Sequence, residues 1–182
     1  MRYKRIMIFG SPGSGKSTLG LFLSRKLDLP LFHNDKNFYI RDWIERNVQE
    51  FFDITFNITQ QKNYIIDGNC TRMMLERDCS GRVDMIIYLD VARSICLWRV
   101  IKRFVKNKLF GKEPQLHDRA PGCGERLSWN FLKNNLWTYR KKTEPRLLKI
   151  REKYPKIVCI RVSNSHEMQE LERVLSQDQE QK

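Results

Sequence analysis

Short apolar runs rich in β-branched residues recur along the chain, and stretches with helical spacing of apolar positions lie between them. Such continuous runs are typical of strands buried on both faces, whereas apolar positions three and four residues apart indicate helices. The runs predict strands at 5–9, 31–33, 64–66, 85–89 and 157–160. The helical patterns cover 16–28, 43–61, 91–106, 126–153 and 166–176. This alternation predicts an α/β fold, a three-layer sandwich with helices on both faces of a five-stranded parallel sheet.

Interruptions of this pattern indicate where elements end. Pro145 is expected to break the helical stretch that contains it, and the polar residues 177–182 are expected to fray. Residues 108–124 contain two prolines and three glycines, so we interpret them as a loop. No repeat or linker is evident. We therefore expect a single domain over 1–182 with a lid inserted at about 107–126.

Residues 10–18 read GSPGSGKST and directly follow the first predicted strand. A glycine-rich turn between a buried strand and a helix is typical of a phosphate-binding loop, whose backbone N–H groups converge on the β- and γ-phosphates of a nucleotide. In such a loop Lys16 supplies a mobile positive charge for the transferred phosphoryl group, and the Ser17 hydroxyl can bind Mg²⁺. A glycine turn without a ligand is the alternative, and it explains the flanking strand and helix less well. The motif predicts a nucleoside triphosphate site.

Two aspartates end predicted strands, and ligands of parallel sheets bind at the carboxyl ends of strands. Asp67 precedes Gly68, and a carboxylate at this place can hold Mg²⁺ through water. The alternative for Asp67 is an Asp-Gly turn with no metal role. Asp90 could serve instead, but we interpret it as the N-cap of the helix that follows. The predicted metal-binding residues are therefore Ser17 and Asp67.

Asp35 follows the second predicted strand and is the candidate for the acceptor side of the site. A carboxylate here could accept the proton of a substrate hydroxyl as that hydroxyl attacks the γ-phosphoryl group. Phe38, Tyr39 and Trp43 could then stack against a planar ring. It is equally possible that Asp35 caps a turn and that the three aromatic residues pack in the core. His33 is expected to face the sheet rather than the substrate.

Basic residues flank the predicted lid. Arg99 and Arg103 are four residues apart and share a helix face, which Lys106 continues. Two guanidinium groups aimed at one place suit the phosphate oxygens of a transition state, although a solvated basic helix is the alternative. Beyond the loop, Arg140 and Arg146 could close over the nucleotide from the other side.

Composition and charge limit the class of protein. Hydrophobic residues make up 41% and charged residues 30%, a globular balance, and no apolar stretch or leader predicts a membrane span or a signal peptide. The five cysteines are scattered and never spaced as C-x-x-C, which favours a reducing cytoplasm over a disulfide framework or a zinc site. The net charge of +13 fits a nucleic-acid partner, and it fits equally a site that holds several phosphate charges.

Four segments resemble a known group of proteins. They are GSPGSGKST at 10–18, YIIDGN at 64–69 followed by Arg72, LDVARSICLWRVIKR at 89–103, and TEPRLL at 143–148. Together they resemble adenylate-kinase-like P-loop proteins and, most closely, the family labelled DNA topology modulation protein, or FlaR-like. The resemblance implies ATP and Mg²⁺ as cofactors. It implies nucleotide-binding residues Gly13, Ser14, Gly15, Lys16, Ser17 and Thr18, and it makes Arg99 and Arg103 the arginine pair leading into the lid and Arg140 an arginine after it. With Ser11 added to the loop, and with Lys16 and Asp35 taken from the chemistry of the residues themselves, the candidate catalytic residues are Lys16, Asp35, Arg99, Arg103 and Arg140.

The acceptor half departs from the adenylate kinase pattern. The segment from Asp67 to Arg72 is one residue longer than the family's D-G-F-P-R motif and lacks its proline. The T-G-D-x-L-R segment that holds AMP is absent, and His33-Asn-Asp35 stands in its place. An acid at this place resembles kinases that phosphorylate a hydroxyl group. We therefore expect a phosphotransferase acting on a nucleoside, a nucleotide or another small acceptor; the alternative is a nucleotide-dependent DNA-binding regulator of DNA topology.

Overall fold

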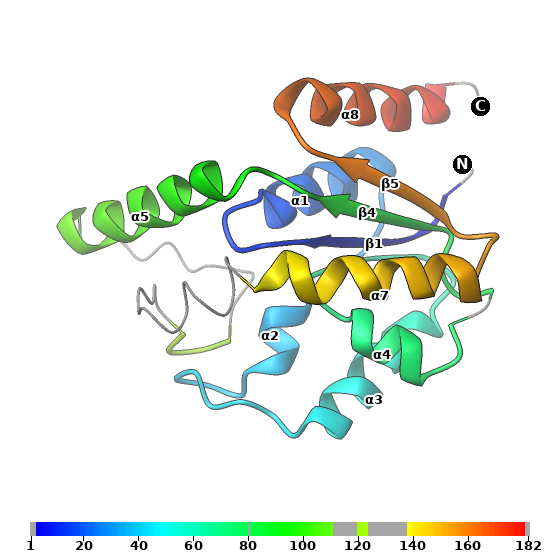
Figure 1. The fold of residues 1–182 in the computed structure, drawn as a ribbon, viewed down its shortest axis with the longest axis horizontal. Helices are drawn as coiled ribbons and strands as arrows, with labels where there is room; N and C mark the ends of the chain where they lie inside the picture. The colour runs from blue at the N-terminus through cyan, green and yellow to red at the C-terminus, as the bar shows by residue number, and fades with distance from the viewer. Residues whose placement is uncertain (1–2, 80, 111–119, 124–137, 181–182) are drawn as a thin grey trace.

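The computed structural model describes residues 3–79, 81–110, 120–123 and 138–180. Five parallel strands form one sheet in the order β2-β3-β1-β4-β5 (Figure 1). The strands are β1 (Arg5–Gly10), β2 (Leu31–His33), β3 (Tyr64–Asp67), β4 (Met85–Leu89) and β5 (Val158–Val162). The helices are α1 (Lys16–Leu27), α2 (Asn34–Phe38), α3 (Val48–Thr59), α4 (Thr71–Glu76), α5 (Arg93–Phe110), α7 (Tyr139–Lys153) and α8 (Ser165–Glu180). The predicted α/β class, the parallel sheet and its five strands are confirmed.

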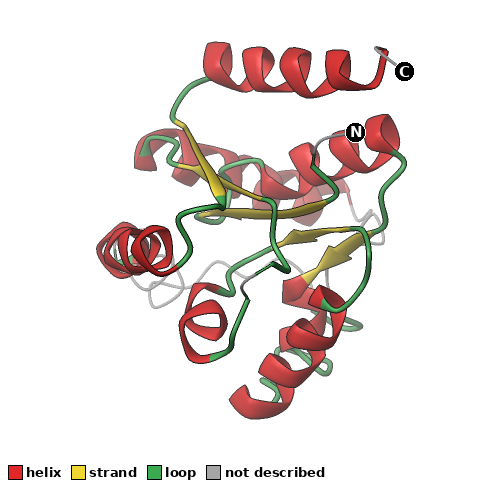
Figure 2. Ribbon diagram, turned by 90° about the vertical axis from the view of Figure 1, so that its right-hand side faces the viewer, coloured by secondary structure: helices red, strands yellow, loops and turns green. Residues whose placement is uncertain are grey.

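Helices cover both faces of the sheet, and each face has its own apolar core (Figures 1 and 2). On one face, Ile6 and Ile8 of β1 pack with Leu19 of α1 and Leu171 of α8. On the other face, alternate strand residues pack against α3, α4 and α7. These core residues include Met7, Phe9, Phe51, Phe52, Met73, Met74, Ile150 and Tyr154. The alternation along β1 shows why the strand reads as a continuous apolar run: both of its faces are buried.

Several predicted helix boundaries were wrong. Helix α3 begins at Val48 rather than at 43, because the Asn47 side chain accepts a hydrogen bond from the Gln49 N–H and caps the helix there. Upstream of this cap, Asp42 and Trp43 have positive φ angles of 48° and 62°. A right-handed helix cannot contain two such residues, so the helix cannot begin at 43. The short helices α2 and α4 were not predicted, since neither contains enough residues to display a period.

The predicted break at Pro145 is also wrong, because α7 runs through this residue to Lys153. Proline removes one backbone N–H from the helix ladder. Here the second half of α7 is held by burial of Ile150 in the core, and Tyr154, just past the helix, is buried as well. Packing of this half against the sheet offsets the lost hydrogen bond.

At three further ends the structure extends past the prediction. Helix α5 continues to Phe110 and so takes up the first residues of the expected loop at 108–124, and β5 ends at Val162. Helix α8 continues to Glu180, so most of the segment expected to fray is helical. The greater part of the expected lid at 107–126, and the predicted helix over 126–137, lie outside the described residues. None of the described helices combines the length and the hydrophobicity needed to cross a bilayer.

Candidate functional site

The phosphate-binding loop connects β1 to α1 at the carboxyl edge of the sheet. Gly13 and Gly15 have φ angles of 79° and 101°, and Gly15 stands at the N-cap of α1. The Ser14 N–H donates to the Ser11 carbonyl over 3.1 Å, which closes the turn. A loop that ends on a helix N-terminus in this way directs backbone N–H groups towards an anion. The predicted nucleotide-binding residues therefore form one continuous segment, in which Ser11 to Gly15 make the loop and Lys16 to Thr18 begin α1.

Glycine at position 13 is required by the neighbouring helix as well as by its φ angle. A Cβ on Gly13 would lie 2.5 Å from the Cys96 carbonyl oxygen of α5. Because that atom belongs to the backbone of a helix, it cannot move aside cheaply. The loop thus packs directly on α5, and this contact fixes the position of α5 over the phosphate site.

We expect Gly13→Ala to lower the free energy of unfolding by about 2–4 kcal/mol, combining left-handed backbone strain with overpacking. Gly81 is the matched control, since its φ is also positive, at 67°, yet a Cβ there would meet nothing within 4 Å. Gly81→Ala should therefore cost only the backbone term, about 1–2 kcal/mol. Urea unfolding of both variants measures the difference. Equal losses would show that the contact with Cys96 does not constrain the loop.

Two cations lie against the loop. The Lys16 ammonium donates to the Ser11 carbonyl over 3.2 Å, so its side chain folds back along the turn. Arg99 reaches across from α5, and its guanidinium donates to the carbonyl oxygens of Gly13 at 3.2 Å and Ser14 at 3.4 Å. Arg103 follows one turn later on α5 and is half-buried. The structure therefore brings Lys16 and Arg99 together at the P-loop, and their roles at the γ-phosphate stay predictions.

Asp67 ends β3 and is buried, with 5% of its side chain exposed. A Cβ on Gly20 would lie 3.7 Å from the Asp67 Cβ, so the aspartate packs against the first turns of α1. Ser17 lies three residues before Gly20 and hence on the same face of that helix. Ser17 therefore lies on the face of α1 that packs against Asp67, a placement that a Mg²⁺ site shared by these two residues would require. The described residues contain no cluster of three His, Cys, Asp or Glu side chains, so Mg²⁺ here would be completed by water and phosphate oxygens.

His33 contacts Asp67 and was not recognised as part of the site from the sequence. The His33 Nδ1 atom lies 3.0 Å from Asp67 Oδ2, and the two residues are paired in register across β2 and β3. An ionised carboxylate only accepts hydrogen bonds, so the histidine tautomer that suits this contact carries its proton on Nδ1. The ring therefore orients the carboxylate and leaves its other oxygen for a ligand. Only the strand pairing reveals this contact, because the residues are 34 positions apart.

Substituting His33 should weaken Mg²⁺ binding without reaching the metal directly. We expect His33→Leu to raise the Mg²⁺ concentration for half-maximal activity about tenfold, the lower range for groups that orient a metal ligand. His33→Asn keeps an N–H donor near the Nδ1 position and should recover part of the loss. His166 lies exposed on α8, so His166→Leu is the matched control. A Mg²⁺ titration that is unchanged in His33→Leu would contradict the positioning role.

Asp35 lies in α2, directly after β2, and its side chain is exposed at the same edge of the sheet. The preceding residue, Asn34, is buried and packs so closely on Gly68 that a Cβ there would lie 2.7 Å from the Asn34 Cβ. The Thr55 hydroxyl donates to the Asn34 side-chain oxygen over 3.3 Å. Asn34 therefore anchors α2 to the turn after β3, which places Asp35 beside the turn that follows Asp67.

The aromatic residues after Asp35 pack mainly on one another. Phe38 makes edge contacts with Tyr39 and with Phe51 of the core, at ring-centroid distances of 4.9 Å and 5.2 Å. Tyr39 makes a similar contact with Trp43 at 5.0 Å. Phe38 thus packs against the core, as the alternative to substrate stacking predicted. Tyr39 and Trp43 are half-buried beside it. Stacking of these two on a substrate ring stays a prediction.

Asp90 is not the N-cap of α5, because that helix begins three residues later, at Arg93. Instead the carboxylate accepts from two arginines, Arg161 of β5 with Nε at 3.0 Å and Arg140 of α7 at 2.9 Å. Glu144 joins the same cluster, and its Oε1 lies 2.9 Å from the Arg140 Nε. Arg140 therefore lies in the first turn of α7, and its guanidinium forms ion pairs with Asp90 and Glu144 next to the end of β4. The predicted role of Arg140 over the nucleotide, and that of Arg146 further along α7, stay predictions.

Tyr139 connects the start of α7 to the turn after β3. Its hydroxyl is hydrogen bonded to the side-chain oxygen of Asn69, in the turn after β3. Burial raises the pKa of the Tyr139 phenol, so the hydroxyl stays protonated and able to donate. The sequence contained no signal for this contact, because tyrosine in a helix most often packs in the core.

Comparison with known proteins supports the same fold. No protein-family profile matches the chain. An adenylate kinase of Encephalitozoon cuniculi is 26% identical over 122 residues, which cover 57% of this chain and 68% of that protein. A shikimate kinase from Acinetobacter baumannii, solved in complex with shikimate, superposes with a TM-score of 0.55 at 14% identity, covering 99% of this chain and 95% of its own. An unliganded sugar kinase from Janibacter superposes with a TM-score of 0.52 at 15% identity, covering 96% of this chain and 93% of its own.

The P-loop, the 2-3-1-4-5 sheet order and these similarities place the chain among the adenylate-kinase-like P-loop kinases at the level of the superfamily. This is the fold and the enzyme class that the sequence predicted. The narrower resemblance to the DNA topology modulation proteins stays a prediction.

Proposed function

We propose that the protein transfers the γ-phosphoryl group of Mg·ATP to a hydroxyl group of a small acceptor such as a nucleoside, a nucleotide or another metabolite. The observation that carries this proposal is the meeting of three parts at one sheet edge. The P-loop follows β1, Asp67 ends the adjacent β3, and Asp35 follows β2 on its far side. The loop predicted to bind the phosphoryl donor, the acid proposed to bind the metal and the acid proposed to serve the acceptor thus follow three adjacent strands.

On the donor side, the chain's own groups position and neutralise phosphate charge. The loop amides and the α1 N-terminus hold the β- and γ-phosphates, and Lys16 swings from the Ser11 carbonyl to the transferred group. Arg99 is already within reach of the loop and adds a guanidinium for the oxygens of the transition state. Ser17 and Asp67 would hold Mg²⁺, which would neutralise negative charge on the phosphate groups. Arg103 and Arg140 are proposed to complete this positive environment.

On the acceptor side, Asp35 is proposed to accept the proton of the attacking hydroxyl. Its place two residues beyond His33, which itself contacts Asp67, sets the acid close to the metal side of the site. A hydroxyl bound to Asp35 would therefore approach the γ-phosphoryl group from the β2 side. Two of the solved relatives are named for shikimate and for a sugar, and both compounds bear hydroxyl groups, which is consistent with this assignment.

A product screen tests the proposal directly. The protein is incubated with Mg·ATP and a panel of nucleosides, nucleoside monophosphates, sugars and hydroxy acids, and each mixture is examined by mass spectrometry. We expect a hydroxyl-bearing compound to gain one phosphate group, with ADP formed in equal amount. Phosphorylation of AMP alone, with no hydroxyl acceptor used, would overturn the assignment of Asp35.

A DNA-binding regulator is the second candidate, and one observation favours it. Helix α5 carries no acidic residue, and five of its basic side chains are exposed: Arg93, Arg99, Lys102, Lys106 and Lys108. Such a surface would bind duplex phosphates without reading sequence. Binding that persists at physiological salt, with a steep dependence on salt concentration, would support this function. Binding confined to low salt would assign the charge to the phosphoryl site and to solubility.

The cysteines and the two cores support proposals about the cellular compartment and the domain organisation of the protein. All five cysteines are unpaired, and four of them are buried, which fits a reducing compartment and supports a cytoplasmic protein. The single sheet with one core on each face supports a single domain, and the lid at about 107–126 stays a prediction.

A further inference from the structure

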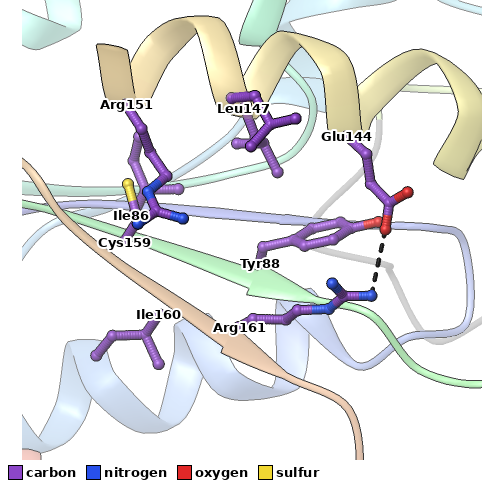
Figure 3. Close-up of a pocket in the computed structure, with 9 residues that line it drawn as sticks. Ile86, Tyr88, Glu144, Leu147, Arg151, Cys159, Ile160 and Arg161 are labelled. Carbon is purple, nitrogen blue, oxygen red and sulfur yellow. Dashed lines mark hydrogen bonds and ion pairs between the residues drawn. The ribbon is translucent and has the colours of Figure 1, made fainter.

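A cavity of about 320 Å³ lies between β5 and α7, on the face of the sheet opposite α1 and α8 (Figure 3). Its floor is formed by Ile86 and Tyr88 of β4 and by Cys159 of β5, and Leu147 of α7 lies above them. This volume equals that of about ten water molecules in the liquid, at the lower limit of small-molecule sites. A single-ring compound can be accommodated in such a space.

The cavity exists because the last strand of the sheet is only partly covered. Every residue of β4 is buried, but Cys159 and Ile160 of β5, which line the cavity, are only half-buried. Helix α7 passes over this region, yet 58% of the Leu148 side chain remains exposed at the rim. Apolar surface left open beside a formed cavity favours an apolar ligand group, whose burial would remove it from water.

The charges at the rim favour an anion. Arg151 extends from α7 towards Cys159 (Figure 3), and among the residues that the structure describes it has no carboxylate partner. Its guanidinium lowers the pKa of the Cys159 thiol, against the larger effect of burial, which raises it. Arg161 stands at the other end of the cavity, and one of its nitrogens lies 3.2 Å from Glu144 Oε1. Of the two guanidinium groups at the cavity, that of Arg161 is paired with carboxylates, whereas that of Arg151 has no carboxylate partner among the described residues.

We propose that this cavity binds a small organic anion with an apolar body of about one ring, its carboxylate held by Arg151 and its apolar part lying on Ile86, Leu147 and Cys159. A guanidinium can take a carboxylate in two parallel hydrogen bonds, and the apolar floor selects the body of the ligand. The cavity is separate from the P-loop, so this binding does not depend on phosphoryl transfer. The arginine cluster at Asp90 is its nearest link to the proposed site, through Arg161.

The test uses the full-length protein and 3-phenylpropanoate as the probe, with binding measured by calorimetry or by NMR titration. We expect saturable binding in the wild type and a loss of about tenfold or more in affinity in Arg151→Gln, as for hydrogen bonds to a charged group. Lys149→Gln removes an exposed charge from the same helix two residues away and should bind normally. The neutral amide of the probe should bind about tenfold more weakly or worse.

A second readout locates the ligand. Cys159 is the one cysteine that is not buried, so N-ethylmaleimide should modify it first, and Cys159→Ser should remove that fast reaction. Bound 3-phenylpropanoate should slow the modification in the wild type and in Lys149→Gln, but not in Arg151→Gln. Absence of saturable binding, equal affinity in Arg151→Gln, or binding without protection of Cys159 would overturn the proposal. Inorganic phosphate that binds as tightly as the probe would overturn the apolar part of it.

Discussion

Replacing Lys16 with alanine should abolish phosphoryl transfer while leaving the fold intact. The Lys16 ammonium is the mobile cation of the P-loop, and no other described side chain combines this position with a flexible stem. Removing one group that stabilises transition-state charge costs about 10²–10³ in rate, so we expect a loss of about 10³-fold or more for this unit charge. Among the described residues, the substitution removes one hydrogen bond, which joins the ammonium to the Ser11 carbonyl over 3.2 Å. That bond contributes about 1 kcal/mol, so the variant should unfold nearly as the wild type does.

The matched control is Lys26→Ala, because Lys26 is exposed in the last turn of the same helix. It changes the net charge equally but lies far from the loop, so its turnover should match the wild type. Rates are measured with Mg·ATP and the acceptor found in the product screen. Unchanged turnover in Lys16→Ala, with normal activity in the control, would rule out the mechanism built on this loop.

Replacing Asp35 with asparagine should reduce turnover on a hydroxyl acceptor by about 10²–10⁴-fold, the usual contribution of a general base. Asparagine has nearly the same shape, and the fold here is held by the neighbouring Asn34, which packs on Gly68. The KM for the acceptor should therefore change far less than kcat. An effect confined to KM would show that Asp35 binds the acceptor without taking its proton.

Asp28→Asn is the control for this change. Asp28 is exposed at the C-cap of α1 with a left-handed φ of 50°, a conformation that asparagine also adopts readily. The same loss of one negative charge at that position should leave both kcat and KM unchanged. ATP hydrolysis without an acceptor gives a second reference, since it does not need the base and should persist in Asp35→Asn.

The parts that followed from the sequence are those encoded by neighbouring residues. Strand β4 was predicted with its correct bounds because a parallel strand buried on both faces reads as an unbroken apolar run. The P-loop was evident because its glycines, its lysine and its flanking strand and helix all fall within one short segment. Predicted helix boundaries were wrong where a side chain capped the helix at another residue. Asn47 caps α3, so this helix begins at Val48, five residues later than the apolar pattern suggested.

Contacts between distant segments could not be predicted in the same way. Asp90 was interpreted as a helix cap because only its neighbours were visible in the sequence, whereas it is bound by Arg140 and Arg161, 50 and 71 residues away. The sheet order brings β4 beside β5 and sets α7 above them, and this order creates the cluster. The predicted helix break at Pro145 was wrong for a related reason, because burial of the second half of α7 outweighs the tendency of proline to end a helix.

By itself, then, the sequence determined the fold class, the phosphate-binding loop and the class of reaction, because each depends on patterns within a few turns of chain. The P-loop predicted where the donor binds. Only the tertiary structure decided what surrounds the loop: His33 lies behind Asp67, and Arg99 reaches across to Gly13 and Ser14. It also decided the separate cavity between β5 and α7. These depend on which strands pair and which helices lie over them, and that choice is made by packing the whole sheet.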